Sequence, residues 1–172
     1  MTKLVPATDR LRFRPYMLGD LEAAFGMFAD DDARAYYPQM AEPEHVQGWI
    51  EWNLRNYKEH GFGLWALELR TSGEFVGDCG LTFQEVEGRQ ELEVGYHIVH
   101  SHRRQGLASE AARASLDYGF SNTHSTMVCS IVSVSNVASR QVAERVHTHW
   151  RRFMKNDQQM LLFYTPRAFW RG

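Results

Sequence analysis

The chain has few of the features that mark secreted, membrane-spanning or nucleic-acid-binding proteins. Its 172 residues contain only two cysteines, Cys79 and Cys129, which are too few for a disulfide scaffold. No run of apolar residues is long enough to span a bilayer, and residues 1–10 contain no apolar core of signal-peptide length. The formal net charge of −2 gives no reason to expect nucleic acid or an acidic membrane as a partner. We therefore expect a cytoplasmic protein.

The composition predicts one packed domain, residues 1–172. Hydrophobic residues make up 44% and aromatic residues 13%, which argues against disorder, and the length suits a single core. Apolar periodicity predicts strands at 11–14, 62–69, 74–83, 91–99, 126–134, 151–155 and 159–164. It predicts helices at 21–28, 43–60, 108–120 and 136–145, with Asp20 as a helix cap. Turns are expected at 71–73, 85–90 and 156–157, and 147–149 is expected to be loop.

The stretch from Glu91 to Phe120 has the strongest functional signal. It reads as a strand, a basic turn that contains a glycine, and an alanine-rich helix. The first amides of a helix have no intrahelical partner, and the helix dipole favours negative charge there, so this junction could hold an anion. No Gly-Lys-Ser/Thr follows Gly106, which excludes a P-loop, and the three-glycine dinucleotide pattern is absent. A plain strand-to-helix connection remains the alternative.

The motif Arg103-x-x-Gly106-x-Ala108 resembles the pyrophosphate-binding motif of the GNAT N-acetyltransferase superfamily. The neighbouring words Glu93-Val94-Gly95-Tyr96, Ser109-Glu110-Ala111 and Asn136-x-x-Ser139 are similar to those of its RimJ/RimL-like branch. The resemblance implies an α/β fold with a mixed, mostly antiparallel seven-stranded sheet, about four flanking helices, and splayed fourth and fifth strands. It implies acetyl-CoA as cosubstrate, no metal, an amine-bearing small molecule or peptide N-terminus as acceptor, and a possible homodimer.

The resemblance also implies roles for individual residues. The coenzyme would be held by Arg103, Arg104, Gln105, Gly106, Leu107, Ala108, Ser109 and Asn136, and by backbone amides near Tyr96, His97 and Ile98. Gly95 is compatible with a bulge that opens the strand. Glu93 would be the base, directly or through water, and Ser139 would hydrogen-bond the departing sulfur. Taken without the family, Glu93 reads as a surface residue paired with an arginine, and Asn136 as a helix cap.

Acceptor contacts are expected from Tyr36, Tyr37 and Trp49, although large aromatic side chains are usually core. Asp78 is expected to face outward, with attraction of the acceptor ammonium as the alternative. Glu91 is the fallback base, and His97 is a minor candidate because its pKa needs little tuning.

Several other chemistries are disfavoured. His97, His100 and His102 have no cysteine partner, so a metal site is not expected. Asp30-Asp31-Asp32 lacks calcium-loop spacing and reads as a solvated helix end. Neither Cys79 nor Cys129 has a recognisable histidine partner, which disfavours an acyl-cysteine route. A catalytically inactive acyl-CoA-binding module, acting as sensor or scaffold, remains the alternative function.

Overall fold

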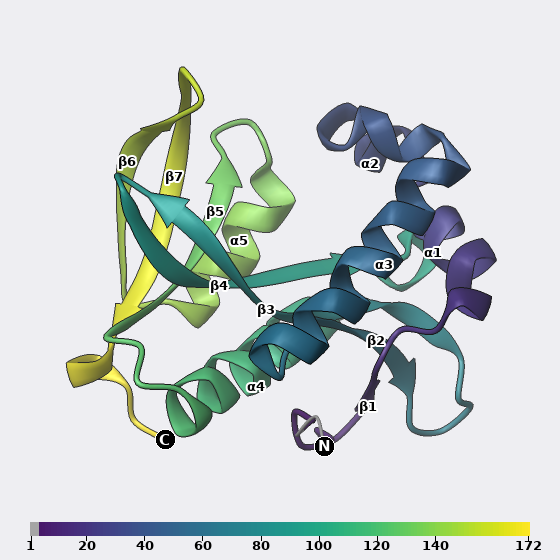
Figure 1. Cartoon of the computed structure of the whole chain (residues 1–172), viewed down its shortest axis with the longest axis horizontal. Coiled ribbons are helices and arrows are strands. Elements are labelled where there is room, and N and C mark those ends of the chain that lie inside the picture. The colour runs from purple at the N-terminus through teal and green to yellow at the C-terminus, as the bar shows by residue number, and fades with distance from the viewer. Residues whose placement is uncertain (1–3) are drawn as a thin grey trace.

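The computed structural model describes residues 4–172 and contains a seven-stranded sheet (Figure 1). The strand order is β1-β2-β3-β4-β5-β7-β6, and the only parallel pair among the described residues is β4 with β5. The strands are β1 (Leu11–Arg14), β2 (Leu64–Leu69), β3 (Phe75–Val86), β4 (Arg89–Ile98), β5 (Met127–Ser133), β6 (His149–Lys155) and β7 (Gln158–Pro166). The predicted mixed, mostly antiparallel sheet is confirmed.

Five α-helices flank the sheet: α1 (Leu21–Met27), α2 (Asp31–Tyr36), α3 (Pro43–His60), α4 (Leu107–Asn122) and α5 (Val137–Val146). Short 3-10 turns lie at Leu18–Asp20, Pro38–Ala41, His100–His102 and Arg167–Phe169. The sequence did not predict α2. Asp30 caps this helix by accepting a hydrogen bond from the Ala33 amide, so the acidic run begins a helix rather than ending one. Within residues 4–172, no helix is both long and apolar enough to cross a bilayer.

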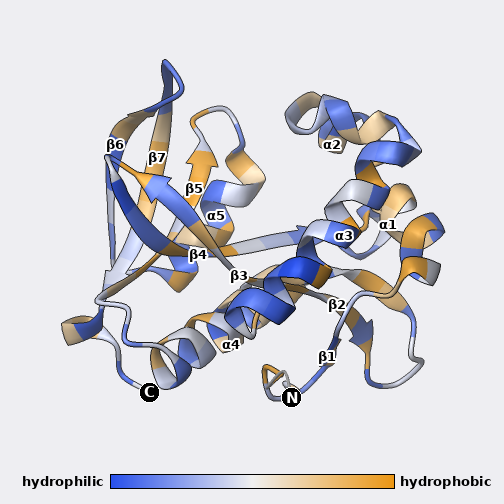
Figure 2. Ribbon diagram, in the orientation of Figure 1, coloured by the Kyte–Doolittle hydropathy of each residue, from blue (hydrophilic) through white to orange (hydrophobic). Residues whose placement is uncertain are grey.

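The helices cover opposite faces of the sheet. Neighbouring residues of β3 show this, because the Cys79 thiol contacts Ser115 of α4 while the Asp78 carboxylate contacts Trp49 of α3. The outward turns of α3 are hydrophilic, whereas β5 is largely apolar (Figure 2). Two buried clusters follow from this arrangement, one mainly between the sheet and α4 and one among α1, α2 and α3.

The hairpin between β3 and β4 is longer and tighter than predicted. Pairing runs without a register shift from Gly77–Ile98 to Val86–Arg89. The turn is therefore only Glu87-Gly88, both at positive φ, as two-residue hairpin turns require. Gly95, which the sequence left compatible with a bulge, pairs regularly with Gly80, so the β3–β4 ladder has no bulge there. A Cβ at Gly95 would instead press on the Leu64 side chain at 3.3 Å.

Strands β4 and β5 part soon after they meet. Only Leu92–Val128 and Glu93–Cys129 pair, although both strands continue beyond these residues. Backbone groups of an antiparallel strand alternate between its two neighbours. The Val99 amide donates to the Val76 carbonyl, so the backbone groups of Val99, and of every second residue before it, face β3. The backbone groups of Tyr96 and Ile98 therefore face β5. The predicted splay is confirmed.

The predicted loop after α5 is confirmed at residues 147–148 and ends one residue earlier than predicted. His147 is buried at the C-cap of α5, where its ring contacts Ser130 and Thr165, and His149 begins β6. No glycine is needed at this C-cap, because His147 leaves the helix in an extended conformation (φ −99°, ψ 158°). The predicted turn at Asn156-Asp157 is confirmed, with both residues at positive φ.

Candidate active site

The turn that leads into α4 presents a row of unused backbone donors. Within residues 4–172, the amides of residues 104–109 have no hydrogen-bond acceptor, and the first intrahelical bond of α4 runs from Glu110 to Gly106. Arg104 (φ 59°) and Gly106 (φ 79°) adopt left-handed conformations that curl the chain around these donors. Free amides at a helix N-terminus are groups suited to anion binding, and we call the six of residues 104–109 the cradle.

An orphaned side chain supports this interpretation. The Ser109 hydroxyl, in the first turn of α4, is buried and has no hydrogen-bond partner. A buried hydroxyl without a partner costs stability, and a ligand that supplied an acceptor would offset this cost. A diphosphate would provide acceptors both for the amides and for a hydroxyl of this kind.

The cradle is supported from the N-terminal segment, which sequence reasoning missed. Glu110 of α4 accepts hydrogen bonds from the Thr8 hydroxyl (2.6 Å) and from the Arg10 amide and guanidinium. The Arg10 guanidinium also donates to the Gln105 carbonyl and lies 3.4 Å from where a Cβ on Gly106 would stand. The only signal given by the sequence was the resemblance of Ser109-Glu110-Ala111 to the family.

The Arg103 side chain is committed elsewhere. Its guanidinium makes two hydrogen bonds with the Asp30 carboxylate, at 2.9 and 2.7 Å, and donates to the Ile98 carbonyl. This pair lowers the pKa of Asp30 despite its partial burial. Arg103 therefore joins α2 to the end of β4 and leaves anion binding to the neighbouring amides.

A cleft of about 290 Å³ opens where β4 and β5 diverge. Its lining includes Glu93, Gly95, Tyr96 and His97 from β4, Ile131 from β5 and Ser139 from α5, together with aromatic side chains of α3 and of the segment after α2. The backbone amides predicted to hydrogen-bond the acetyl oxygen do not all point into this cleft. Those of Tyr96 and Ile98 face the gap, whereas that of His97 faces β3.

Two side chains close the vertex of the splay. The Glu93 carboxylate accepts from the Ile131 amide at 3.1 Å and lies at 3.5 Å from the Thr82 hydroxyl. The Ser130 hydroxyl donates to the Val94 carbonyl at 2.8 Å. Burial raises the pKa of Glu93, and the Ile131 hydrogen bond and the charge of Lys155 only partly offset this effect. Glu93 is thus not a surface residue paired with an arginine.

The start of α5 reaches the other wall of the cleft. Asn136 caps this helix by accepting from the Ser139 amide at 3.1 Å, which confirms its role as a cap. The Tyr96 hydroxyl crosses from β4 to donate to the Ser139 carbonyl at 2.7 Å. The Ser139 hydroxyl lines the cleft and has no hydrogen-bond partner in the described part of the chain.

The aromatic residues predicted to touch an acceptor are only partly brought together. Tyr37 and Trp49 line the cleft, and Trp52, which the sequence analysis passed over, lies beside Trp49 with ring centroids 5.2 Å apart. Tyr36 is not part of this lining, and its hydroxyl donates instead to the Ser135 carbonyl.

Asp78 does not face outward as expected. It is fully buried and accepts from the Tyr16 hydroxyl (2.8 Å) and the Trp49 indole (3.2 Å), while its other oxygen lies 2.7 Å from Nδ1 of His97. His97, His100 and His102 approach three different carboxylates, those of Asp78, Asp30 and Glu74, so they do not converge on one point.

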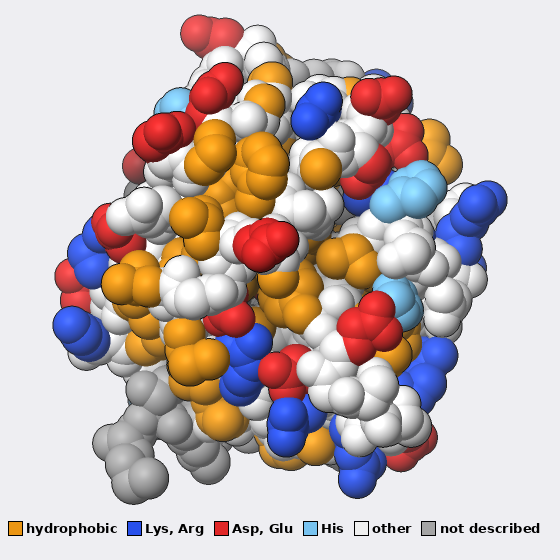
Figure 3. All heavy atoms as spheres, turned by 90° about the vertical axis from the view of Figure 1, so that its right-hand side faces the viewer, with side chains coloured by type: hydrophobic (Ala, Val, Ile, Leu, Met, Phe, Trp, Pro, Cys, Tyr) orange, Lys and Arg blue, Asp and Glu red, His pale blue; other side chains and the backbone are white. Residues whose placement is uncertain are grey.

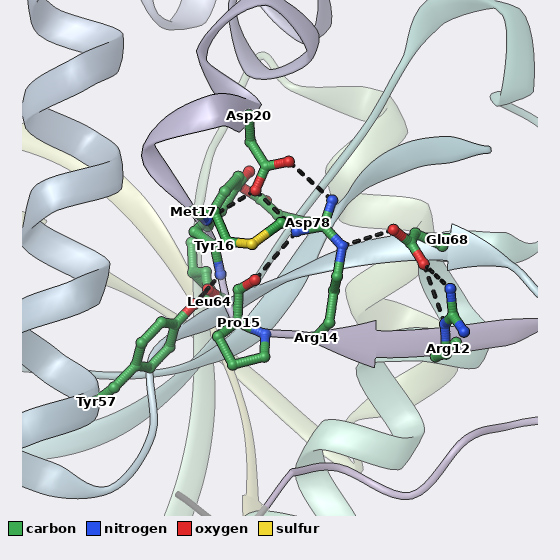
Figure 4. Close-up of polar contacts among 10 residues, drawn as sticks. All are labelled: Arg12, Arg14, Pro15, Tyr16, Met17, Asp20, Tyr57, Leu64, Glu68 and Asp78. Carbon is green, nitrogen blue, oxygen red and sulfur yellow. Dashed lines mark hydrogen bonds and ion pairs between the residues drawn. The ribbon is translucent and has the colours of Figure 1, made fainter. Parts of the chain in front are cut away.

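A polar network fixes Tyr16, and with it one side of Asp78 (Figure 4). The half-buried Arg14 guanidinium of β1 donates to the Asp20 carboxylate at 2.8 Å and to the Glu68 carboxylate at 2.5 Å. Arg12 also donates to Glu68. These arginines lower the pKa values of Asp20 and Glu68. Asp20 is at the predicted N-cap position of α1, but its side chain binds Arg14 and the Met17 amide and makes no capping hydrogen bond.

The face of the molecule seen in Figure 3 mixes acidic, basic and apolar side chains. Acidic and basic side chains are interspersed on this face, and neither kind forms a continuous patch. A basic surface of the kind that follows a nucleic-acid backbone is therefore absent from this face.

Comparison with known proteins decides the family. Residues 10–149 match the family described as "Acetyltransferase (GNAT) domain". The chain belongs to the GNAT acetyltransferase family. A GNAT relative, the uncharacterized N-acetyltransferase YoaA of Bacillus subtilis, is 31% identical over 78% of this chain and 77% of its own. The uncharacterized protein YkkB of the same species is 35% identical over 98% of this chain and 97% of its own.

The GNAT fold is shared with solved acetyltransferase structures. One is RimL, an acetyltransferase of the α-amino group of ribosomal protein L7/L12, solved in complex with coenzyme A. It superposes with a TM-score of 0.74, covering 95% of this chain and 98% of its own, at 16% identity. At that identity the likeness shows the fold alone, and its ligand is that protein's own.

Proposed function

We propose that this chain transfers the acetyl group of acetyl-CoA to a primary amine by direct attack. The observation that carries the proposal is that the cradle, the open edge of β4 and the cleft adjoin one another. A cradle of six free amides at the start of α4 adjoins a strand whose free backbone groups lead into a cleft lined by a carboxylate. Acetyl-CoA supplies an activated thioester when bound. The Ser109 hydroxyl and the amides of residues 104–109 are the groups that we assign to its diphosphate.

Direct attack is favoured over an acyl-cysteine route by the state of the two thiols. Cys79 and Cys129 are both buried, and burial raises the pKa of Cys79 to about 12 and that of Cys129 well above its ordinary value. A thiol must be ionised to act as a nucleophile. Neither residue lines the cleft.

The rest of the site matches the demands of amine acetylation. The Tyr96 and Ile98 amides are candidates to polarise the thioester carbonyl, a contribution of about 3–4 kcal/mol to the barrier in comparable oxyanion holes. The Ser139 hydroxyl is the candidate to hydrogen-bond the departing sulfur. In this proposal the Glu93 carboxylate at the vertex attracts the acceptor ammonium, and its predicted role as the base, directly or through water, is the alternative that a fall in kcat of Glu93→Gln would support.

The acceptor that fits this cleft is a cationic amine with an apolar stem. Tyr37, Trp49 and Trp52 offer ring faces and edges to such a stem, and aromatic faces also stabilise an ammonium. Peptide N-termini and small amines both meet this description. A panel of amines assayed for release of free coenzyme A thiol identifies the class, and light scattering tests the predicted homodimer.

The experiment that separates an enzyme from an inactive acyl-CoA-binding module is Glu93→Gln. A glutamine oxygen can still accept from the Ile131 amide, so the vertex stays closed while the charge is lost. We expect kcat/KM for the amine to fall at least about tenfold, mainly through a higher KM, with acetyl-CoA affinity unchanged within about twofold. Binding of acetyl-CoA without thiol release by the wild-type protein for any amine would favour the inactive module.

A further inference from the structure

The Asp78 carboxylate is the most deeply buried charge-bearing group beside the cleft. It has no exposed surface and three partners, Tyr16, Trp49 and His97, which come from three separate segments of the chain. An ionised carboxylate in such a place is costly unless a cation or several donors compensate it. Among the described residues no lysine or arginine bonds it, so His97 is its only potentially cationic partner.

The contact with Asp78 fixes the state of the His97 ring. A carboxylate accepts, so Nδ1 carries the hydrogen, and a neutral ring then has its acceptor lone pair on Nε2. The ring is held edge-on among Phe28, Tyr37 and Trp49, with centroid distances of 5.0–5.7 Å. Within residues 4–172, Nε2 has no hydrogen-bond partner, and His97 lines the cleft.

Glu93 is less free than His97 to take a proton. One of its oxygens accepts from the Ile131 amide and the other lies 3.5 Å from the Thr82 hydroxyl, so both oxygens are engaged at the vertex. Both residues lie on the same face of β4, since strand side chains alternate and four positions separate them. The cleft therefore contains one carboxylate engaged at the vertex and one oriented imidazole with a free nitrogen.

We propose that His97, oriented by the buried Asp78, is the proton acceptor for the amine substrate. The inference rests on the proposed acetyl transfer and names a catalytic residue and a positioning residue for it. Nε2 takes one proton from the substrate ammonium, and the resulting imidazolium is paired with Asp78. The amine lone pair then forms the new N–C bond while the C–S bond breaks. The second proton passes to the leaving thiolate, and His97 returns its proton to solvent, so the products are an amide and a thiol.

The pH dependence of proton transfer to His97 depends on the titratable groups that surround its ring and Asp78. On the ring side these are Asp78 from β3, Glu93 from β4 and Tyr37 from the segment after α2. Behind Asp78 lies the Tyr16 hydroxyl, and α1 and α3 contribute only the non-titrating rings of Phe28 and Trp49. Burial and Asp78 raise the pKa of Tyr16 well above its ordinary value, so this hydroxyl remains a donor.

The first test needs no substrate. Nitrogen-15 spectra of the histidine rings in the free wild-type protein should show His97 with its hydrogen on Nδ1 when neutral. In Asp78→Asn this preference should be lost, because a side-chain amide can donate to Nδ1 as well as accept from it. Tyr16→Phe is the matched control, since it removes one donor to Asp78 without touching His97, and it should keep the Nδ1–H form. A neutral wild-type ring protonated on Nε2 would overturn the proposal.

The second test is kinetic. His97→Gln should lower kcat/KM for the amine by about 10²–10⁴-fold and abolish its rise with pH over the histidine range, with acetyl-CoA affinity unchanged. Glu93→Gln should keep that rise and act mainly on KM, and Asp78→Asn should lower kcat with little change in KM. If His97→Gln keeps both rate and pH profile while thiol release continues, the proposal is wrong and the acetyltransferase assignment survives. If wild-type protein binds no acetyl-CoA, the proposed function fails instead.

Discussion

At the scale of single residues, His147 supports the vertex of the splay without lining the cleft. Its Nε2 is 3.0 Å from the Ser130 hydroxyl, and that hydroxyl donates to the Val94 carbonyl which the splay leaves free. Since the Ser130 hydrogen is used on Val94, His147 must donate to Ser130 through Nε2, and burial favours the neutral ring. Its other nitrogen, Nδ1, then accepts from Thr165, 3.3 Å away. Burial lowers the pKa of His147 from 6.5 to about 3.

This histidine makes stability depend on pH in one direction. Its folded-state pKa lies below the unfolded value, so the unfolded chain takes up the proton first as pH falls. The contribution of neutral His147 is full above about pH 6.5 and is lost toward pH 3. Between pH 7 and pH 5 this loss is about 2 kcal/mol of unfolding free energy. His147→Gln, which can keep hydrogen bonds without titrating, should lose about 2 kcal/mol less over that range in denaturant unfolding. Equal losses for variant and wild type would contradict this account.

The roles of single residues were the least predictable from sequence. Asp78 was expected to face outward because aspartate in a strand is usually exposed. Its three partners lie 62, 29 and 19 positions away, so no local pattern could report them. His147 does lie in a loop, as predicted, but its burial and its partners on β5 and β7 could not be predicted for the same reason.

At the scale of elements, a negative charge at the N-terminus of α4 should affect coenzyme binding and folding stability in opposite directions. Gly106 has φ 79°, a conformation that Asn and Asp tolerate better than other non-glycine residues. Gly106→Asp would add a charge that suits the helix dipole but repels a phosphate. We expect acetyl-CoA to bind at least about tenfold more weakly to this variant than to Gly106→Asn, with the Asp variant at least as stable in denaturant.

The two variants of Gly106 share the positive φ, the added Cβ and nearly the same shape. Their difference in affinity, measured by calorimetry, therefore reports charge at the cradle. Equal affinities would mean that no anion binds at this turn.

Elements with a strong period were predicted well, and those defined by contacts were not. The sheet strands and α3 follow from apolar periodicity, and the splay was expected from the family resemblance. Helix α2 has only six residues, too few for a periodic signal, and depends on its Asp30 cap and on Arg103. The turn after β3 was predicted at 85–90 and is shorter, because nothing in the sequence indicates that Glu87 adopts a positive φ.

At the scale of the whole molecule, ligand binding should appear as stabilisation. A ligand that binds only the folded chain adds about 2.7 kcal/mol at 100 times its Kd. For a chain of 172 residues that corresponds to a rise in Tm of about 5–10 °C. We expect acetyl-CoA and coenzyme A to produce this rise in calorimetry, and Gly106→Asp to reduce it at the same concentration. A rise of the same size in that variant would show that the nucleotide binds elsewhere.

The account as a whole depends on where the diphosphate of the coenzyme lies. The most direct measurement is a crystal structure of the protein grown with acetyl-CoA. We predict diphosphate oxygens within hydrogen-bond distance of the amides of residues 104–109, and the pantetheine arm between β4 and β5 with its thioester in the cleft that Glu93 and His97 line. A nucleotide bound at any other surface, or none at saturating concentration, would contradict the account.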